Sequence, residues 1–265
     1  MRPSYRPQPA PPPPPSLVQQ WLPRALLVAV LATAAYFVWG WLSPALGFKR
    51  VGPQPSDGNK VLVLLHGYGA SGDDLVSLAE QLSAASPDVT FLVPAGPHRV
   101  NVTGRAWLPP MVPSEYATRL PAEVENTSQR VWEVIDYARK KGAECGDIYV
   151  GGFSQGGWMA AEVALRGPAD CALGGVIVMS GGGVHMDHSP VTGHPRMRVL
   201  VTHGKQDSIV ALPKGRATAQ LFAAGGHDVQ WLEFEGPHGI PTAVREAIPG
   251  FLRGETVGLV VTAEP

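Results

Sequence analysis

Short apolar runs alternate with amphipathic segments between residues 60 and 252. The apolar runs have the length of buried strands, and the segments between them repeat apolar residues at helical spacing. Strands are predicted at 60–65, 89–93, 147–153, 174–180, 198–203 and 229–234, and helices at 73–84, 121–141, 155–166, 214–224 and 241–252, with a Pro-rich loop before the second helix. This alternation predicts an α/β fold whose mostly parallel sheet carries helices on both faces.

The N-terminal region has a different pattern. A Pro-rich segment (1–24) precedes an uncharged apolar run (25–42), which would span ~27 Å as a helix, close to the ~30 Å of a bilayer core. This run predicts a single transmembrane helix. It is followed by a linker (43–57), the α/β domain (58–253) and a tail (254–265) that receives no assignment.

Two interpretations of the apolar run remain open. Ala32-Thr33-Ala34 resembles a signal-peptidase site, which would release the mature protein. The run stays apolar through Trp39, which favours an uncleaved signal anchor instead. Positive charge is slightly greater on its N-terminal side, so we expect that end inside and the catalytic domain on the exported side of the membrane.

The composition and charge of the chain limit the kinds of binding partner that we expect. The chain has 265 residues, of which 45% are hydrophobic and 16% charged, with a net charge of −1. Residues 1–50 contain five Arg or Lys and no acid, so subtracting +5 from −1 leaves −6 for the remainder. An acidic domain without a basic run is not expected to bind nucleic acid. The oligomeric state stays open.

The two cysteines are too few for a disulfide framework or a four-ligand zinc site. Cys145 and Cys171 each precede a predicted strand, so a disulfide at the amino ends of neighbouring strands is geometrically possible in an oxidising compartment; a reduced pair is the equal alternative. A loop containing His185, Asp187, His188 and His194 invites a metal interpretation. It has no helical face to align the imidazoles, so we expect a surface loop and no bound metal.

The clearest chemical motif is a serine between two glycines. Gly152-Phe153-Ser154-Gln155-Gly156 matches G-x-S-x-G between a predicted strand and a predicted helix. Such a turn lifts the hydroxyl above the sheet, and larger side chains at the two glycines would collide. Ser154 is therefore the candidate nucleophile, and a glycine-rich turn with an incidental serine is the alternative.

A nucleophilic serine needs a base and an acid, which follow it in the chain in this kind of fold. Asp207 follows the strand 198–203, and His238 follows the strand 229–234. Both positions lie just past the carboxyl end of a strand, where functional groups gather in a parallel sheet. We therefore expect Asp207 as the acid and His238 as the base; the competing acids are Asp187, Glu233 and Glu235.

A second glycine-rich turn, residues 65–72, follows the first predicted strand. Gly67-x-Gly69-x-x-Gly72 formally matches a dinucleotide fingerprint, but the next strand does not end in the acid that would hold a ribose. An oxyanion loop fits better, with the backbone N–H groups of Tyr68 and Gln155 as donors. For the substrate, Trp107, Leu108 and Met111, in the loop before the long helix, are predicted to contact its apolar part.

Together these segments resemble the phospholipase/carboxylesterase family of α/β-hydrolases, which includes bacterial carboxylesterases and acyl-protein thioesterases. The resemblance covers about residues 58–253 and depends on LLHGYGASGDDL, GGFSQGGWMA, MSGGG, THGKQDSIV and a final Gly-Pro-His-Gly. It implies the same triad and oxyanion donors, and the short stretch between the serine helix and Asp207 leaves no room for a large cap domain.

The sequence thus predicts a membrane-anchored serine carboxylesterase that acts on a small ester or lipid-like substrate through an acyl-enzyme, without a cofactor. A lysophospholipase or an acyl-protein thioesterase is the alternative within the enzymes. A catalytically inactive binding module with this fold is the alternative outside them.

Overall fold

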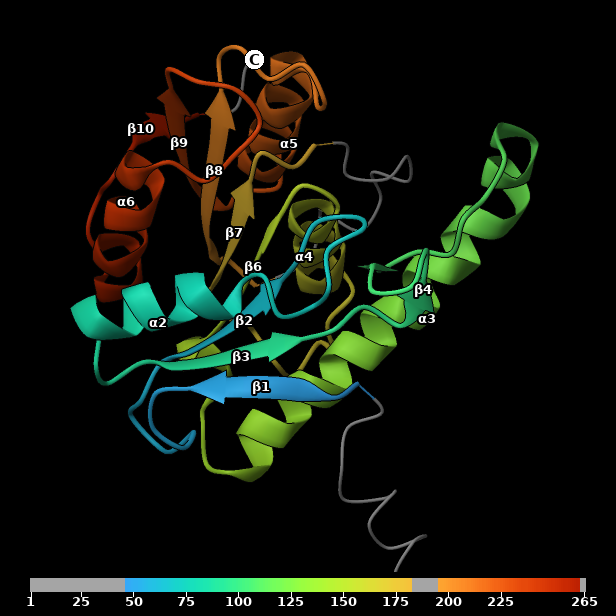
Figure 1. Cartoon of the computed structure of the whole chain (residues 1–265). Helices are drawn as coiled ribbons and strands as arrows, with labels where there is room; N and C mark the ends of the chain where they lie inside the picture. Colours follow the sequence, from blue (N-terminus) through green and yellow to red (C-terminus); the bar gives the residue numbers. More distant parts are fainter. Residues whose placement is uncertain (1–45, 183–194, 263–265) are drawn as a thin grey trace, which may run out of the picture. The chain divides into compact units, whose positions relative to one another are not determined.

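The computed structural model describes residues 46–182 and 195–262. Within them, eight strands form one sheet in the order β1-β3-β2-β6-β7-β8-β9-β10 (Figure 1). The six inner strands run parallel, and the two edge strands are antiparallel to their neighbours. The inner strands are β2 (Val61–Leu65), β3 (Thr90–Pro94), β6 (Ile148–Phe153), β7 (Gly175–Met179), β8 (Arg198–Gly204) and β9 (Asp228–Phe234). The predicted mostly parallel α/β sheet is confirmed.

Helices cover both faces of the sheet, and each face has its own apolar cluster. On one face lie α3, α4 and α5, and on the other α2 and α6 pack side by side (Figure 1). Their bounds are α2 (Val76–Ala85), α3 (Pro113–Lys140), α4 (Gln155–Leu165), α5 (Leu212–Ala224) and α6 (Thr242–Arg253). Strands β2, β3 and β7 are buried along their whole length, as their uninterrupted apolar sequences require.

The sheet is wider than expected at both edges. Strand β1 (Phe48–Val51) lies in the segment expected as linker, and β10 (Leu259–Val261) lies in the unassigned tail. Both strands are short and contain solvent-exposed residues, so the sequence has no long apolar run that would have predicted them. Their pairing with β3 and β9 places both segments within the α/β domain.

Helix α3 begins eight residues earlier than the sequence pattern indicated. Pro113 occupies the first turn, where a missing N–H costs nothing, and the Glu115 carboxylate accepts a hydrogen bond from Val112 N at 3.1 Å. Pro121 lies inside the helix, where it cannot donate a backbone hydrogen bond, and the nearby Leu120 and Val124 are buried in the core. Helix α2 begins at Val76, so Asp73 and Asp74, at the start of the predicted helix 73–84, precede it.

Two further short strands, β4 (His98–Arg99) and β5 (Arg105–Ala106), pair as a separate ribbon. A short 3-10 turn, η1 (Cys145–Asp147), leads into β6. Cys145 and Cys171 form a disulfide with their Cα atoms 5.4 Å apart, so the pairing that the sequence left open is present. It joins the amino ends of β6 and β7.

The apolar run 25–42 lies outside the described residues, as does the histidine-containing loop at 185–194. Among the residues that are described, no helix is both long and apolar enough to cross a bilayer. The same residues contain no cluster of metal-ligating side chains.

The direction in which successive strands are added to the sheet changes between β2 and β6. The chain adds β3 on one side of β2 and then returns to build β6 to β9 on the other. The carboxyl ends of β2 and β6 are in register at Leu65 and Gly152. Ligand sites of open parallel sheets lie at such a switch point, so the turns after β2 and β6 mark the place to examine.

Candidate active site

Ser154 lies on the tight turn between β6 and α4 and has a strained backbone. Its φ of 56° and ψ of −119° are unusual for a residue with a side chain, a strain of about 1–3 kcal/mol. Two hydrogen bonds hold the turn, from Ser154 N to Met179 O at 2.9 Å and from Trp158 N to Ser154 O at 3.1 Å. The serine is thus fixed between strand β7 and the first turn of α4.

The flanking glycines are required by close backbone contacts. A Cβ atom at Gly152 would overlap the carbonyl group of Gly156. A Cβ atom at Gly156 would overlap the carbonyl oxygens of Leu65 and His66, at the end of β2. The absence of side chains at both positions therefore lets α4 begin directly against the turn that follows β2.

Asp207 and His238 come from the loops after β8 and β9 and contact each other. His238 Nδ1 lies 2.7 Å from Asp207 Oδ2, and the carboxylate side chain has no exposed surface. The backbone N–H groups of Ile209 and Val210 donate to Asp207 Oδ1 at 2.9 and 2.8 Å. A second histidine, His203 of β8, has its Nε2 3.2 Å from Asp207 Oδ2.

These contacts set the charge of the acid. Burial by itself raises the pKa of Asp207, but the hydrogen bonds from His238 and from Val210 and Ile209 outweigh it and hold that pKa below its usual range. An ionised carboxylate is only an acceptor, so His238 carries a hydrogen on Nδ1. In the neutral imidazole with this tautomer, Nε2 has the lone pair.

The loop of His238 is tied to the serine turn by two contacts. The Phe153 ring lies beside the His238 ring, with centroids 4.7 Å apart. The Ser180 hydroxyl, at the end of β7, donates to Gly239 O at 3.1 Å. The two other sequence-predicted acids, Glu233 and Glu235, form ion pairs with Arg216 and Lys205 instead. The third, Asp187, lies outside the described residues.

The turn after β2 packs against the serine turn. A Cβ atom at Gly67 would meet Ser154 Cβ at 3.5 Å, so the two backbones are in close contact. Tyr68, the next residue, has a largely exposed side chain, and Gln155 Oε1 accepts a hydrogen bond from Trp107 N at 2.9 Å. As the first residue of α4, Gln155 has a backbone N–H without an acceptor inside the helix.

His66 is a site residue that sequence reasoning missed. Its ring is buried, accepts the Gly96 N–H on Nε2 at 2.9 Å, and lies 2.8 Å from Gly67 O through Nδ1. Burial lowers the pKa of His66, which fits a neutral ring donating from Nδ1. The ring of His66 thus fixes the Gly67 carbonyl. In the sequence, the position of His66 directly after a buried strand was the signal that could have identified it as a site residue.

An apolar pocket of about 420 Å3 adjoins the serine turn. Four residues predicted for the site line it, namely Tyr68, Leu108, Met111 and Gln155. Tyr116, Leu120 and Trp158 also line it, and the first two were missed because the early start of α3 was not foreseen.

Trp107, predicted to contact the substrate, does not line this pocket. Its side chain has no exposed surface, and its indole Nε1 donates to His66 O at 2.7 Å. Trp107 follows a strand and precedes an apolar loop. Nothing in that sequence distinguishes a residue that lines the pocket from one that is buried below the pocket. Trp107 therefore supports the turn after β2 from below.

A strained serine at a strand–helix turn, with an aspartate–histidine pair at the same edge of a parallel sheet, defines an α/β-hydrolase. The model of the Phospholipase/Carboxylesterase family matches residues 48–254, so the chain belongs to that family and is a carboxylesterase-family hydrolase.

Relatives agree with this assignment. The acyl-protein thioesterase 1 of Gibberella zeae is 25% identical over 219 residues, which are 76% of this chain and 92% of that protein. The crystal structure of esterase PE8 superposes with a TM-score of 0.68 and 27% identity, covering 79% of this chain and 98% of that one. A carboxylesterase from Mesorhizobium loti shares the fold, with a TM-score of 0.66 and 20% identity over 79% of this chain and 95% of its own.

Proposed function

We propose that the protein hydrolyses carboxylic esters through a Ser154–His238–Asp207 triad. The observation that carries the proposal is the 2.7 Å hydrogen bond between His238 Nδ1 and the buried Asp207 carboxylate, beside the strained turn of Ser154. This bond leaves His238 Nε2 as the free base of the imidazole.

The reaction then runs in two halves. Ser154 Oγ attacks the ester carbonyl carbon while its proton passes to His238 Nε2, and the resulting oxyanion is bound by the N–H groups of Tyr68 and Gln155. The imidazolium returns the proton to the leaving alkoxide, and an alcohol departs. A water molecule activated by His238 attacks the acyl-enzyme, and the acid leaves with Ser154 restored. No step needs a cofactor.

Labelling with a fluorophosphonate probe tests this mechanism. We expect the full-length protein to label and Ser154→Ala to lose the label and about 10⁴-fold or more in turnover. Ser77 is exposed, and Ser77→Ala should keep both the label and the turnover. An unlabelled wild-type protein would instead favour the inactive binding module, and a Ser154→Ala variant that still turned over at a comparable rate would exclude this nucleophile.

A second candidate is a thioesterase or lysophospholipase. It is favoured by the apolar pocket beside Gln155, which suits an acyl chain, and by the name of the Gibberella zeae relative. Comparing short-chain and long-chain p-nitrophenyl esters with lysophospholipid and an acyl thioester as substrates decides between these activities. Preference for a short ester would favour the first proposal.

We further propose that residues 25–42 anchor the enzyme in a membrane, with its catalytic domain on an oxidising side. The uncharged run of 18 residues supports the anchor, and the Cys145–Cys171 disulfide supports the compartment. Alkaline carbonate extraction of membranes should leave the full-length protein in the pellet. Release of the intact chain into the supernatant would contradict the anchor.

A further inference from the structure

His203 is a completely buried histidine to which the proposed mechanism gives no role. It lies near the end of β8, four residues before Asp207, and its imidazole has no exposed surface. The Nε2 atom lies 2.8 Å from Val210 O and 3.2 Å from Asp207 Oδ2. One nitrogen of this ring therefore faces both the carboxylate and the loop that carries it.

The partners of His203 determine where its hydrogen lies. Val210 O is only an acceptor, so Nε2 must carry the hydrogen, and Asp207 Oδ2 lies 3.2 Å from the same nitrogen. The other nitrogen, Nδ1, is buried and has no hydrogen-bond partner among the described residues. A hydrogen on Nδ1 would be a buried donor without an acceptor, which is unfavourable. The neutral tautomer with its hydrogen on Nε2 is therefore the one compatible with the atoms around the ring.

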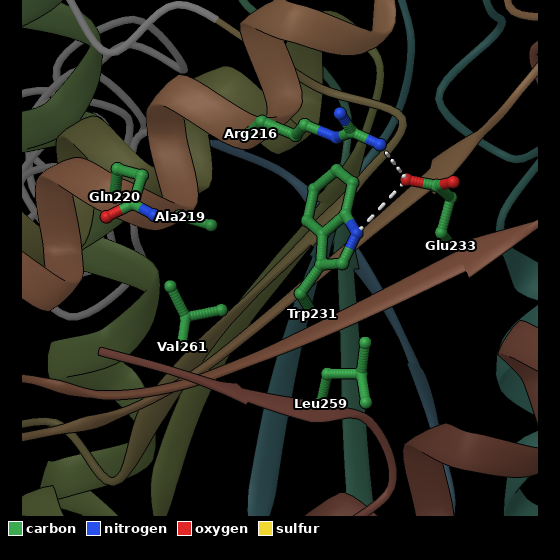
Figure 2. Close-up of a pocket in the computed structure, with 7 residues that line it drawn as sticks. All are labelled: Arg216, Ala219, Gln220, Trp231, Glu233, Leu259 and Val261. Carbon is green, nitrogen blue, oxygen red and sulfur yellow. Dashed lines mark hydrogen bonds and ion pairs between the residues drawn. The ribbon is translucent and has the colours of Figure 1, made fainter. Parts of the chain in front are cut away.

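The ring is also fixed in place from both sides. Trp231 of β9 stacks on it, with an angle of 17° between the rings and 6.3 Å between centroids. Figure 2 shows how that indole is held: Trp231 Nε1 donates to Glu233 at 3.3 Å, and Arg216 bonds the same oxygen at 2.9 Å. On the α5 side, a Cβ atom at Gly215 would overlap His203 Nδ1, so the helix backbone lies directly against the ring.

We propose that His203 is a positioning residue for the catalytic acid. Its Nε2–H holds Asp207 Oδ2 at the point where His238 Nδ1 donates. Asp207 Oδ1 is held by backbone N–H groups, whereas Oδ2 has the two histidine rings as its partners. Without His203, the oxygen that orients the base is held by the base alone. This inference rests on the proposed triad.

Two substitutions at position 203 separate the hydrogen bond from the packing. His203→Phe keeps a flat ring against Trp231 but removes the donor, and His203→Gln restores an N–H near the position of Nε2. We expect His203→Phe to lower kcat per titrated active site by about tenfold to a hundredfold, with KM within about twofold. His203→Gln should recover a large part of that loss.

The pH profile distinguishes positioning from a merely structural role. In His203→Phe the Asp207–His238 pair loses a neighbouring donor, so we expect the acid limb of kcat/KM to move relative to that of the wild-type protein. A structural defect would reduce the number of titratable sites and leave both the turnover of each site and that limb unchanged. The titratable groups on the neighbouring strand β9 are Asp228 and Glu233, and those on helix α5 are Lys214 and Arg216.

A glycine variant gives an independent test that leaves the histidine intact. Gly215→Ala should displace the His203 ring and lower kcat in the same direction, whereas Gly146→Ala, where a Cβ meets nothing within 4 Å, should not. All measurements use the full-length protein, with active sites counted by the fluorophosphonate probe. Wild-type kcat and an unmoved acid limb in His203→Phe would overturn the positioning role. A wild-type protein that does not label would overturn the triad itself.

Discussion

Removing the Cys145–Cys171 disulfide should destabilise the domain without slowing the enzyme. The disulfide closes a loop between residues 26 apart in sequence, and the chain-entropy relation then gives about 3.5 kcal/mol of stabilisation at 25 °C. In a domain of this size, each kcal/mol of lost unfolding free energy lowers the Tm by about 2–4 °C. Losing the disulfide should therefore lower the Tm by about 7–14 °C. Replacing both cysteines by alanine is the direct perturbation.

Turnover should survive because the disulfide lies at the other end of the sheet from the serine. It joins the amino ends of β6 and β7, whereas Ser154 follows the carboxyl end of β6, about 20 Å away along the strand. Below its Tm, the variant should therefore keep wild-type kcat per titrated site. Any large loss would show that the amino edge of the sheet positions the active site.

Thermal unfolding with and without a thiol reductant is the assay. Reductant should lower the Tm of the wild-type protein toward that of the double alanine variant, and it should leave the variant unchanged. Titration of free thiols confirms that the bond has been reduced. If the fully reduced wild-type protein unfolds at the same temperature as the oxidised one, the loop-closure reasoning is wrong.

Three further predictions concern the site. Asp207→Asn should lower kcat by about 10³–10⁴-fold in ester hydrolysis, because an amide can bind the wrong tautomer of His238; a loss below tenfold would contradict the role of the acid. The low pKa of Asp207 stabilises the fold above its unfolded value near 3.9, and this contribution is lost as pH falls through the lower native pKa. Urea unfolding of wild type and Asp207→Asn should therefore converge in acid, and parallel curves from pH 6 to pH 2 would contradict this. Met111→Trp should fill the pocket and lower kcat/KM for octanoyl esters about tenfold or more relative to acetyl esters; equal losses for both would remove the pocket from the acyl site.

The sequence was sufficient for the elements whose signal is local. Six buried strands, the serine turn and the order of the candidate acid and base could all be predicted, because uninterrupted apolar runs and Gly-x-Ser-x-Gly describe short segments completely. Edge strands β1 and β10 could not be predicted. Their stability comes from hydrogen bonds to β3 and β9, and their exposed side chains leave no apolar run to detect.

What only the tertiary structure decided is how side chains from distant segments meet. The sequence could propose Asp207 and His238 as partners, but their 2.7 Å contact depends on the register of β8 and β9. It placed Trp107 among the substrate contacts, yet packing against His66 buries it. The sequence did not single out His203 for a role of its own, since a buried histidine acquires its role from partners that folding alone brings within hydrogen-bond distance.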